Sequence, residues 1–174
     1  MIFLTVGSDI PFDRLVRAVD RWAADRGRSD VFAQIGSGGR LPIHIPCAEL
    51  LDPPEFNRRL IEARVVIGHA GMGTILSALQ HSKPILVMPR RGPLGETRND
   101  HQLATARHLL ALGRVNVAFD EHELATALDR IEDLGARDPI PLFAPAEFTS
   151  RLHAFIHRPP ADQSPQPVLS CPNS

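Results

Sequence analysis

The sequence predicts an α/β fold, a single doubly wound parallel sheet of the Rossmann-like kind with helices on both faces. Three observations predict it. Short runs such as residues 65–68 are apolar at every position, as strands covered on both faces are. Amphipathic segments separate these runs, which is the pattern of strand–helix–strand units. The length of 174 residues suits one domain with a sizeable core.

The strands are predicted from the apolar runs, in chain order. The first run begins at the N-terminus and lacks the basic stretch of a signal peptide, so secretion is not expected. The later runs are rich in β-branched residues and end at glycine, proline or polar residues. The predicted strands are residues 2–7, 31–35, 42–45, 65–68, 84–88 and 115–118.

The helices are predicted from periodic apolar positions between the strands. The first of them starts at Pro11, where the missing amide costs little. Its apolar face carries Leu15, Val16, Val19 and Trp22. The predicted helices are residues 11–26, 55–63, 73–80, 100–112, 121–133 and 146–157. The polar segment 90–99 is too long for a tight turn, and long loops at strand ends tend to hold ligands.

The end of the chain changes in composition after residue 157. Residues 158–174 combine repeated prolines with Ser, Gln and Asn, so we predict a domain over 1–157 and a disordered proline-rich tail over 158–174. In the last predicted helix, Leu152, Phe155 and Ile156 are apolar. We expect them to pack on the core of the domain; the alternative is a surface for docking a partner.

Composition excludes several classes of function. Lysine and arginine number 19 against 20 acidic residues, which leaves no basic surface for nucleic acid. Cys47 and Cys171 lie far apart and belong to no metal-like cluster, so neither a disulfide scaffold nor a metal site is expected. No stretch approaches the roughly 20 apolar residues of a membrane span.

A glycine-rich turn, residues 68–74, joins a predicted strand to a predicted helix. Free amides and the helix dipole there would bind an anion, and Thr74 adds a hydroxyl. The first strand ends in Gly7-Ser8 and would place a second anion pocket on the same edge, so the pair suggests a diphosphate. Tight packing explains such a turn equally well, and the spacing is neither GxGxxG nor a Walker loop.

His69 stands at the head of this turn. Its imidazole could hydrogen-bond a phosphate or a sugar, or act as a base with a pKa close to neutral. A histidine at a strand end can also be a capping or packing residue, and the sequence leaves both roles open.

The polar loop after the fifth strand, residues 89–102, concentrates groups that bind phosphates and sugars. Guanidinium groups suit phosphate, whereas amides and carboxylates can match sugar hydroxyls. Because the loop follows the strand next to the glycine turn, we expect function rather than a merely solvated surface. The candidate side chains are Arg90, Arg91, Glu96, Arg98, Asn99, Asp100, His101 and Gln102.

Several motifs together resemble the C-terminal domain of family 28 glycosyltransferases. They are Thr5-Val6-Gly7, His69-Ala70-Gly71-Met72-Gly73-Thr74, Lys83-Pro84 and Asn99-Asp100-His101-Gln102. The resemblance covers about residues 1–135. Within the family, the chain looks most like the small single-domain members: PssE-like exopolysaccharide proteins and the soluble catalytic subunit of the dolichol-pathway UDP-GlcNAc transferase. It implies the donor-binding C-terminal half of a GT-B fold.

The resemblance also implies roles for individual residues. The donor diphosphate would contact Gly7, Ser8, His69, Ala70, Gly71, Met72, Gly73 and Thr74. The donor sugar would contact Asn99, Asp100, His101 and Gln102. Arg90, Arg91, Glu96 and Arg98 belong to a loop of the PssE type and are candidate phosphate or loop contacts. Where MurG-like members carry a ribose-binding glutamate this chain has Ser77, which weakens ribose recognition at that position.

The activity implied by the resemblance is that of a split inverting glycosyltransferase. This chain would be the UDP-sugar-binding subunit, and a hexosyl group of the GlcNAc or GlcA type would pass to a lipid-linked acceptor in polysaccharide biosynthesis. No metal or other cofactor is implied, because amides and arginines would stabilise the departing UDP. The main base and the acceptor groove would lie on a membrane-anchored partner, which would recruit this cytoplasmic chain to the inner face of the membrane.

Two other functions are alternatives to this one. A non-catalytic nucleotide-sugar-binding or stabilising subunit of a polysaccharide assembly complex would share the fold, and Ser77 mildly favours it. An NAD-dependent oxidoreductase needs GxGxxG after the first strand and an acidic residue after the second. Residues 7–11 and 36–39 supply neither.

Overall fold

The structure is a computed structural model that describes residues 1–136, 138–141 and 143–157. Contacts divide the chain into two units, Met1–Ile140 and Pro141–Ser174, and each is described by itself. Within the described residues no helix is both long and apolar enough to cross a membrane.

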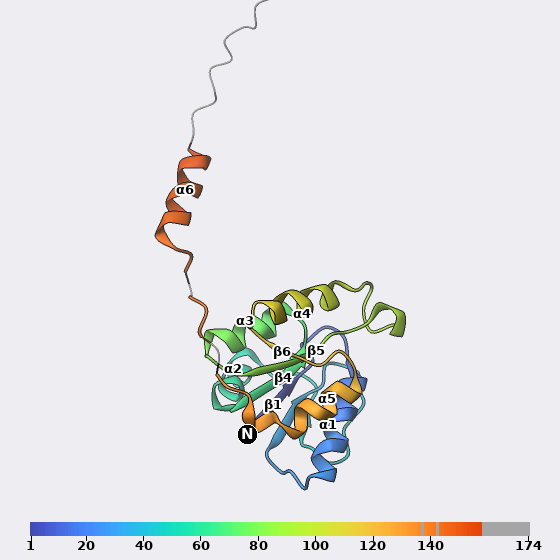
Figure 1. Ribbon diagram of the computed structural model, residues 1–174. Coiled ribbons are helices and arrows are strands. Elements are labelled where there is room, and N and C mark those ends of the chain that lie inside the picture. Colours follow the sequence, from blue (N-terminus) through green and yellow to red (C-terminus); the bar gives the residue numbers. More distant parts are fainter. Residues whose placement is uncertain (137, 142, 158–174) are drawn as a thin grey trace, which may run out of the picture. The chain divides into compact units, whose positions relative to one another are not determined.

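The first unit is built on one six-stranded sheet with the order β3-β2-β1-β4-β5-β6 (Figure 1). Its strands are β1 (Ile2–Thr5), β2 (Val31–Gln34), β3 (Cys47–Ala48), β4 (Val65–His69), β5 (Ile85–Met88) and β6 (Asn116–Val117). Every pairing is parallel, so the predicted doubly wound fold is confirmed. The direction of winding reverses between β1 and β4, which pair directly and place Thr5 beside Gly68. Rossmann-type sheets bind their ligands at this reversal.

Helices cover both faces of the sheet (Figure 1). One face holds α1 (Asp13–Asp25) and α5 (Glu121–Asp129); the other holds α2 (Pro53–Glu62), α3 (Met72–Gln80) and α4 (His101–Ala111). Short 3₁₀ turns, η1 (Gly92–Leu94) and η2 (Ile131–Asp133), follow β5 and α5. The helix predicted over 121–133 therefore ends four residues early, at Asp129, and the separate 3₁₀ turn η2 covers the last three of the predicted residues.

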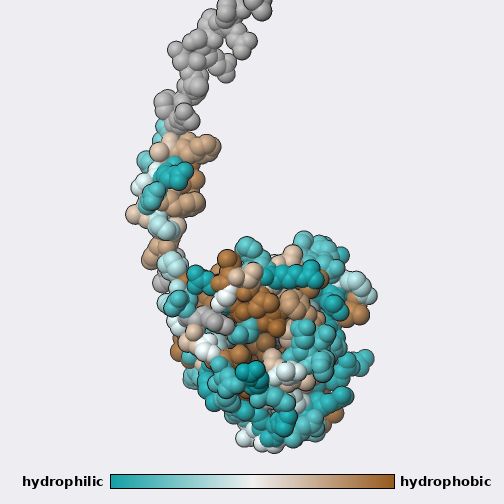
Figure 2. All heavy atoms as spheres, viewed as in Figure 1, coloured by the Kyte–Doolittle hydropathy of each residue, from teal (hydrophilic) through white to brown (hydrophobic). Residues whose placement is uncertain are grey.

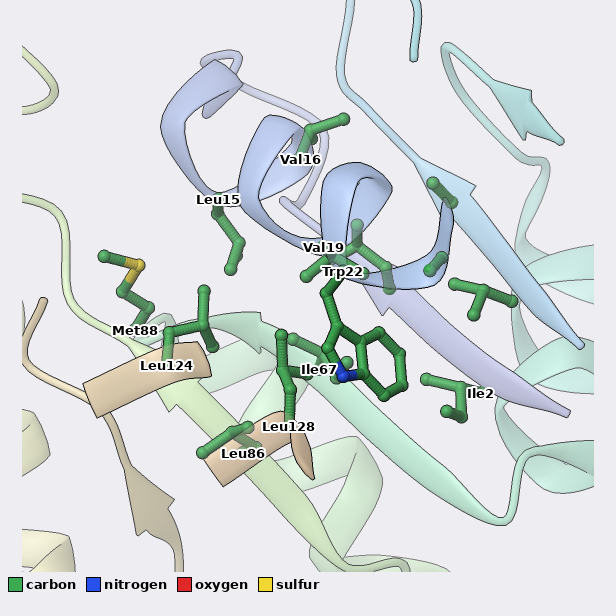
Figure 3. Close-up of a cluster of buried hydrophobic side chains, with 14 of the residues drawn as sticks. Ile2, Leu15, Val16, Val19, Trp22, Ile67, Leu86, Met88, Leu124 and Leu128 are labelled. Atoms are coloured by element: carbon green, nitrogen blue, oxygen red, sulfur yellow. The ribbon is translucent and has the colours of Figure 1, made fainter. Parts of the chain in front are cut away.

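Successive strand residues point to opposite faces and supply two hydrophobic clusters. In β1, Ile2 and Leu4 pack toward α1 and α5, whereas Phe3 packs toward α2 and α3. Figure 3 shows the first cluster, in which side chains of α1 meet Leu124 and Leu128 of α5 over the sheet. This alternation explains why the strands are apolar at every position.

The predicted third strand over residues 42–45 is wrong, and the strand found instead is β3 at Cys47–Ala48. The cause is Asp20, a buried carboxylate on α1. It accepts hydrogen bonds from the main-chain amides of Ile43, His44 and Ile45 at 3.0, 2.8 and 3.0 Å. Amides that are bonded to a side chain cannot pair with β2, so pairing begins only at Cys47.

The second unit contains α6 (Ala146–Ile156), close to the helix predicted over 146–157. No side chain of α6 is buried, and apolar side chains gather along one side of it (Figure 2). Leu152, Phe155 and Ile156 lie on this helix, and the expectation that they pack on the core of the domain stays a prediction. The predicted tail over 158–174 lies outside the described residues, and the domain boundary at residue 157 stays a prediction.

Removing the Asp20 carboxylate should destabilise the fold although alanine favours helices. Asp20→Ala leaves the amides of residues 43–45 without their acceptor, and hydrogen bonds to a charged group contribute about 1.5–3 kcal/mol each. We expect urea denaturation to show a loss of about 3 kcal/mol in the free energy of unfolding. The matched control, Asp25→Ala at an exposed position of α1, should change it by less than about 0.5 kcal/mol. Equal effects of the two substitutions would contradict this account.

Candidate functional site

A cleft of about 610 Å³ opens at the carboxyl ends of the strands, beside the β1–β4 reversal. Its walls come from the segments after β1, β4 and β5 and from the start of α2. The lining residues are Val6, Gly7, Ser8, Asp9, Ile10, Gln34, Leu51, Pro53, Phe56, Asn57, His69, Gly73, Thr74, Ser77, Arg90, Thr97 and Gln102. A hollow of about 620 Å³ also lies between α1 and α5, but helix side chains line it and no strand-end residue reaches it. The first cleft is therefore the candidate site.

The N-terminus of α3 supplies the anion-binding part of the cleft. Gly71 precedes the helix and no side chain caps it. The first helical bond runs from the amide of Ile75 to the carbonyl of Gly71, so the amides of the three preceding residues have no helical acceptor. Gly73 and Thr74 of this turn line the cleft. Such a terminus favours a phosphate or another anion.

The turn after β1 faces the same space. Gly7 has a φ of +81°, a conformation that glycine adopts without strain, and its amide donates to Thr5 Oγ1 at 3.2 Å. Its carbonyl accepts from Gln34 Nε2 at 3.0 Å, and Gln34 Oε1 accepts from the amide of Leu51 at 3.3 Å. Gln34 is 4% exposed and was missed by the sequence analysis. A polar residue at the end of an otherwise apolar strand was the signal available.

His69 lies between the two glycine turns. A Cβ at Gly71 would come within 2.1 Å of His69 Nε2, and a Cβ at Gly7 within 2.9 Å of His69 Cε1. These close approaches explain why both positions carry glycine. The Nδ1 atom of His69 is buried and has no hydrogen-bond partner among the described residues.

The imidazole of His69 is neutral at physiological pH. Its burial, and then the positive charge of Arg90, lower its pKa from 6.5 to about 4. The expectation of a pKa close to neutral is therefore wrong, because it took no account of burial. A neutral imidazole can donate one hydrogen bond and accept one, but its low basicity makes it a poor general base at pH 7.

Arg90 supplies a buried positive charge in the wall of the cleft. It is 3% exposed, and burial lowers its pKa from the usual range of arginine. Its guanidinium donates to the carbonyls of Val6 at 3.0 Å and Pro11 at 2.6 Å, and also to that of Ile10. The structure thus places this candidate phosphate contact against the β1–α1 segment.

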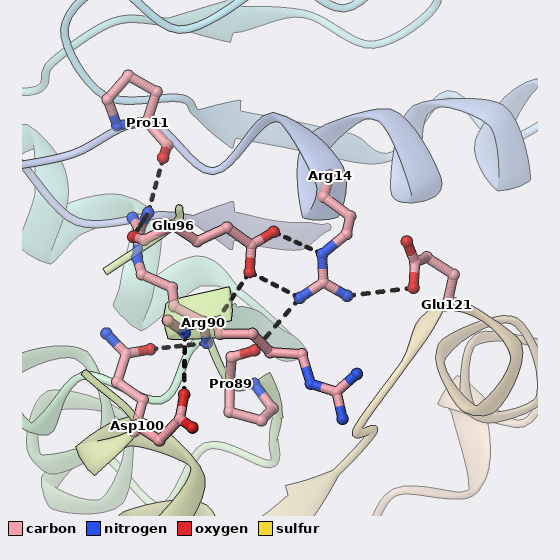
Figure 4. A network of polar contacts seen from close by, with 10 residues as sticks. Pro11, Arg14, Pro89, Arg90, Glu96, Asp100 and Glu121 are labelled. Atoms are coloured by element: carbon pink, nitrogen blue, oxygen red, sulfur yellow. Dashed lines mark hydrogen bonds and ion pairs between the residues drawn. The ribbon is translucent and has the colours of Figure 1, made fainter. Parts of the chain in front are cut away.

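Glu96 ties the loop after β5 to the helices on one face of the sheet (Figure 4). One of its carboxylate oxygens accepts a hydrogen bond from Arg14 Nε at 2.6 Å, and the other accepts one from Arg14 Nη2 at 2.8 Å. The amide of Arg91 donates to the same carboxylate at 2.9 Å, and Arg14 also reaches Glu121 at 3.1 Å. Glu96 is thus a loop contact.

The remaining predicted residues divide into those that line the cleft and those that do not. Gln102 lines the cleft, as does Ser77, the residue found where MurG-like members carry a ribose-binding glutamate. The residues that do not line the cleft are Ala70, Gly71, Met72, Arg91, Arg98, Asn99, Asp100 and His101. Asp100 instead accepts from the amide of Gly92 at 2.9 Å, and Asn99 from that of His101 at 3.3 Å. The ligand roles of all these residues stay predictions.

An apolar wall, missed by the sequence analysis, closes the side of the cleft next to α2. It consists of Leu51, Pro53 and Phe56. Asp52 accepts from the amide of Glu55 at 2.8 Å and so fixes the first turn of α2. In the sequence these side chains look like ordinary core positions. Only the folded structure shows that they lie beside the glycine turns.

Among residues 1–136, 138–141 and 143–157, no group of three or more His, Cys, Asp and Glu side chains could hold a metal ion. Among the residues that the structure describes, Arg90 is the only charged residue that is buried and also lines the cleft. Independence from a metal stays a prediction.

Comparison with known proteins matches residues 1–138 to the glycosyltransferase family 28 C-terminal domain. The UDP-N-acetylglucosamine transferase subunit ALG13 of Eremothecium gossypii is 36% identical over 99 residues, which are 55% of this chain and 45% of that relative. The chain thus spans about half the length of the curated relative that it matches.

Solved structures share the fold at lower identity. The solution structure of ALG13 has a TM-score of 0.56 and 20% identity over 87% of this chain and 93% of that one. Acinetobacter baumannii MurG also has a TM-score of 0.56, with 16% identity over 75% of this chain and 40% of that one. These similarities agree with the predicted resemblance and with the GT-B type of half-fold.

The contact between His69 and Gly71 predicts different effects at two glycines of one turn. Gly71→Ala forces the imidazole to move, and Gly7 confines that ring from another side, so we expect a loss of about 1–3 kcal/mol in the free energy of unfolding. Gly73→Ala meets no atom within 4 Å and lies in a helix, where alanine gains up to about 1 kcal/mol. Urea denaturation measures both, and equal stability of the two variants would contradict the geometry.

The low pKa of His69 predicts a pH dependence of stability. Between pH 6.5 and about 4 the unfolded chain binds a proton at His69 that the folded chain does not, so stability falls as the pH is lowered through this range. From pH 7 to pH 5 the loss due to this group should be about 2 kcal/mol. We expect it to be absent in His69→Gln and present in His81→Gln, an exposed control. NMR titration should place the midpoint of His69 near 4; a midpoint near 6.5 would contradict its burial.

Proposed function

The chain belongs to the glycosyltransferase family 28 C-terminal domain family, and from this premise we propose that it is the UDP-sugar-binding subunit of a split inverting glycosyltransferase. The observation that carries the proposal is the cleft at the β1–β4 reversal. It combines the free amides of α3, the turn at Gly7 and the buried charge of Arg90 in about 610 Å³, a volume suited to a nucleotide-sized ligand.

The parts of the cleft match the parts of a UDP-sugar. The diphosphate fits the α3 terminus and the Gly7 turn, where backbone amides and a positive charge favour anions. The apolar wall of Leu51, Pro53 and Phe56 suits the flat base. Gln102 presents an amide that can donate to sugar hydroxyls. Ser77 offers the ribose a hydroxyl in place of a carboxylate.

Transfer would proceed by attack of an acceptor hydroxyl on the anomeric carbon. The bond between that carbon and the UDP oxygen breaks, the configuration inverts, and negative charge gathers on the departing diphosphate. Fixed amides and the Arg90 charge stabilise that charge as it develops, which is the task a divalent cation performs elsewhere. The acceptor proton needs a base. His69, with a pKa of about 4, fits that task poorly, so we place the base on the partner.

The name of a relative supports a partner subunit. The curated ALG13 sequence, 36% identical to this chain over 99 residues, is described as a subunit of a UDP-N-acetylglucosamine transferase. We propose that a membrane-anchored partner supplies the acceptor side and a lipid-linked saccharide, in polysaccharide biosynthesis at the cytoplasmic face of a membrane. The apolar Leu152, Phe155 and Ile156 of α6 would contribute to docking.

A second candidate is a nucleotide-sugar-binding subunit without turnover. The observation that favours it is Ser77, since the cleft wall holds no carboxylate at that position. The two candidates differ once a partner is present: in the first the cleft must hold the donor sugar for transfer, and in the second it takes no part in turnover.

UDP binding tests the proposal at its first step. Isothermal titration of the isolated chain with UDP should give saturable binding that is unchanged by a metal chelator, because the charge on the diphosphate is met by amides and Arg90. Inorganic phosphate should bind far more weakly, since it lacks the base and the ribose. No binding of UDP or of any UDP-sugar would overturn both candidates.

Activity with the partner separates the two candidates. In a co-expressed pair, Gln102→Ala should lower the rate of sugar transfer by about tenfold or more if the amide holds the donor sugar. The control Gln80→Ala, at the exposed end of α3, should retain full activity. Equal activity of both variants would favour the subunit without turnover.

A further inference from the structure

Arg90 contacts two of the segments that form the cleft. It lies two residues after Met88, the last residue of β5. Its side chain reaches across to the segment after β1, and its main chain contacts the start of α4. We propose that Arg90 is a positioning residue: it holds the turn of residues 7–10 in the shape that receives the ligand and orients Gln102. The identity of that ligand rests on the proposed function.

The guanidinium is used as a rigid fork against the main chain. One terminal nitrogen donates to the carbonyls of Val6 and Ile10, and the other to that of Pro11. These acceptors lie on both sides of the exposed residues Ser8 and Asp9. The turn is thereby fastened at both ends by one side chain.

Two further contacts fix the guanidinium itself. Its central carbon lies 4.8 Å from the centre of the Phe12 ring, a cation–π contact. The terminal nitrogen that bonds Pro11 also reaches the carbonyl of Glu96 at 3.5 Å. A lysine could keep the charge at this place but could not serve several carbonyls in one plane.

The same contacts argue against Arg90 as a direct phosphate ligand. Four N–H groups sit on its terminal nitrogens, and four backbone carbonyls lie within hydrogen-bond distance of them. Only the Nε–H remains. Gripping a phosphate with the fork would require these bonds to break. Arg90 therefore acts on the ligand through the turn and through its charge.

The main chain of Arg90 sets the orientation of Gln102. Its amide donates to Gln102 Oε1 at 3.1 Å. With the oxygen occupied, the Nε2 group of Gln102 keeps both hydrogens for a ligand in the cleft. A shift of Arg90 would move the turn after β1 and this donor together.

The first test compares Arg90→Lys with Arg17→Lys, the same substitution at an exposed position of α1. Loss of the fork should weaken UDP binding at least about tenfold in the first variant and leave it unchanged in the second. The amides of residues 7–10 should exchange with solvent faster in Arg90→Lys alone. Retained affinity with unchanged exchange would overturn the proposal.

A second test needs no variant. In the wild-type chain, NMR should show the terminal guanidinium hydrogens of Arg90 exchanging more slowly than those of Arg17, to the same extent before and after UDP is added. Exchange as fast as that of Arg17, or protection that arises only with UDP, would overturn the positioning role. If the wild type binds no UDP, the proposed function fails, but the exchange of residues 7–10 in the two variants still decides the role of Arg90.

Discussion

The direct pairing of β1 with β4 is the constraint on which the site depends. It places Thr5 beside Gly68, so the turns that follow the two strands meet at one point of the sheet edge. His69 fills the space between them, and a Cβ at Gly71 would lie 2.1 Å from its ring. The N-terminus of α3 then faces the Gly7 turn across a cleft, and neither turn alone would make such a site.

Electrostatics in this cleft come mainly from groups that do not titrate near pH 7. Burial and the neighbouring Arg90 keep His69 neutral, because they lower its pKa to about 4. Arg90 keeps its charge, and its donors are bonded to carbonyls of the β1–α1 segment. Backbone amides add partial positive charge at α3. A site of this kind can bind a diphosphate with little dependence on pH in the physiological range.

The sequence was sufficient for the fold class and for the position of the glycine turns, since both follow from local patterns of apolar residues and glycine. It was insufficient wherever distant side chains decide. Asp20 moved the third strand by bonding amides some 23 residues away, and the roles of Gln34 and Arg90 depend on carbonyls brought near only by folding. In the polar loop, the sequence could not show that Glu96 contacts another part of the protein, because its partner Arg14 lies 82 residues earlier in the chain.

The central claim is that the cleft at the β1–β4 reversal holds the nucleotide. Chemical-shift mapping of UDP on the isolated chain tests it most directly, because every amide reports its own surroundings. The account predicts that the largest shifts fall at residues 7–10, 71–77 and 102, with none at Arg17 or Arg21 in the α1–α5 hollow. Shifts centred on that hollow, or spread evenly over the surface, would contradict it.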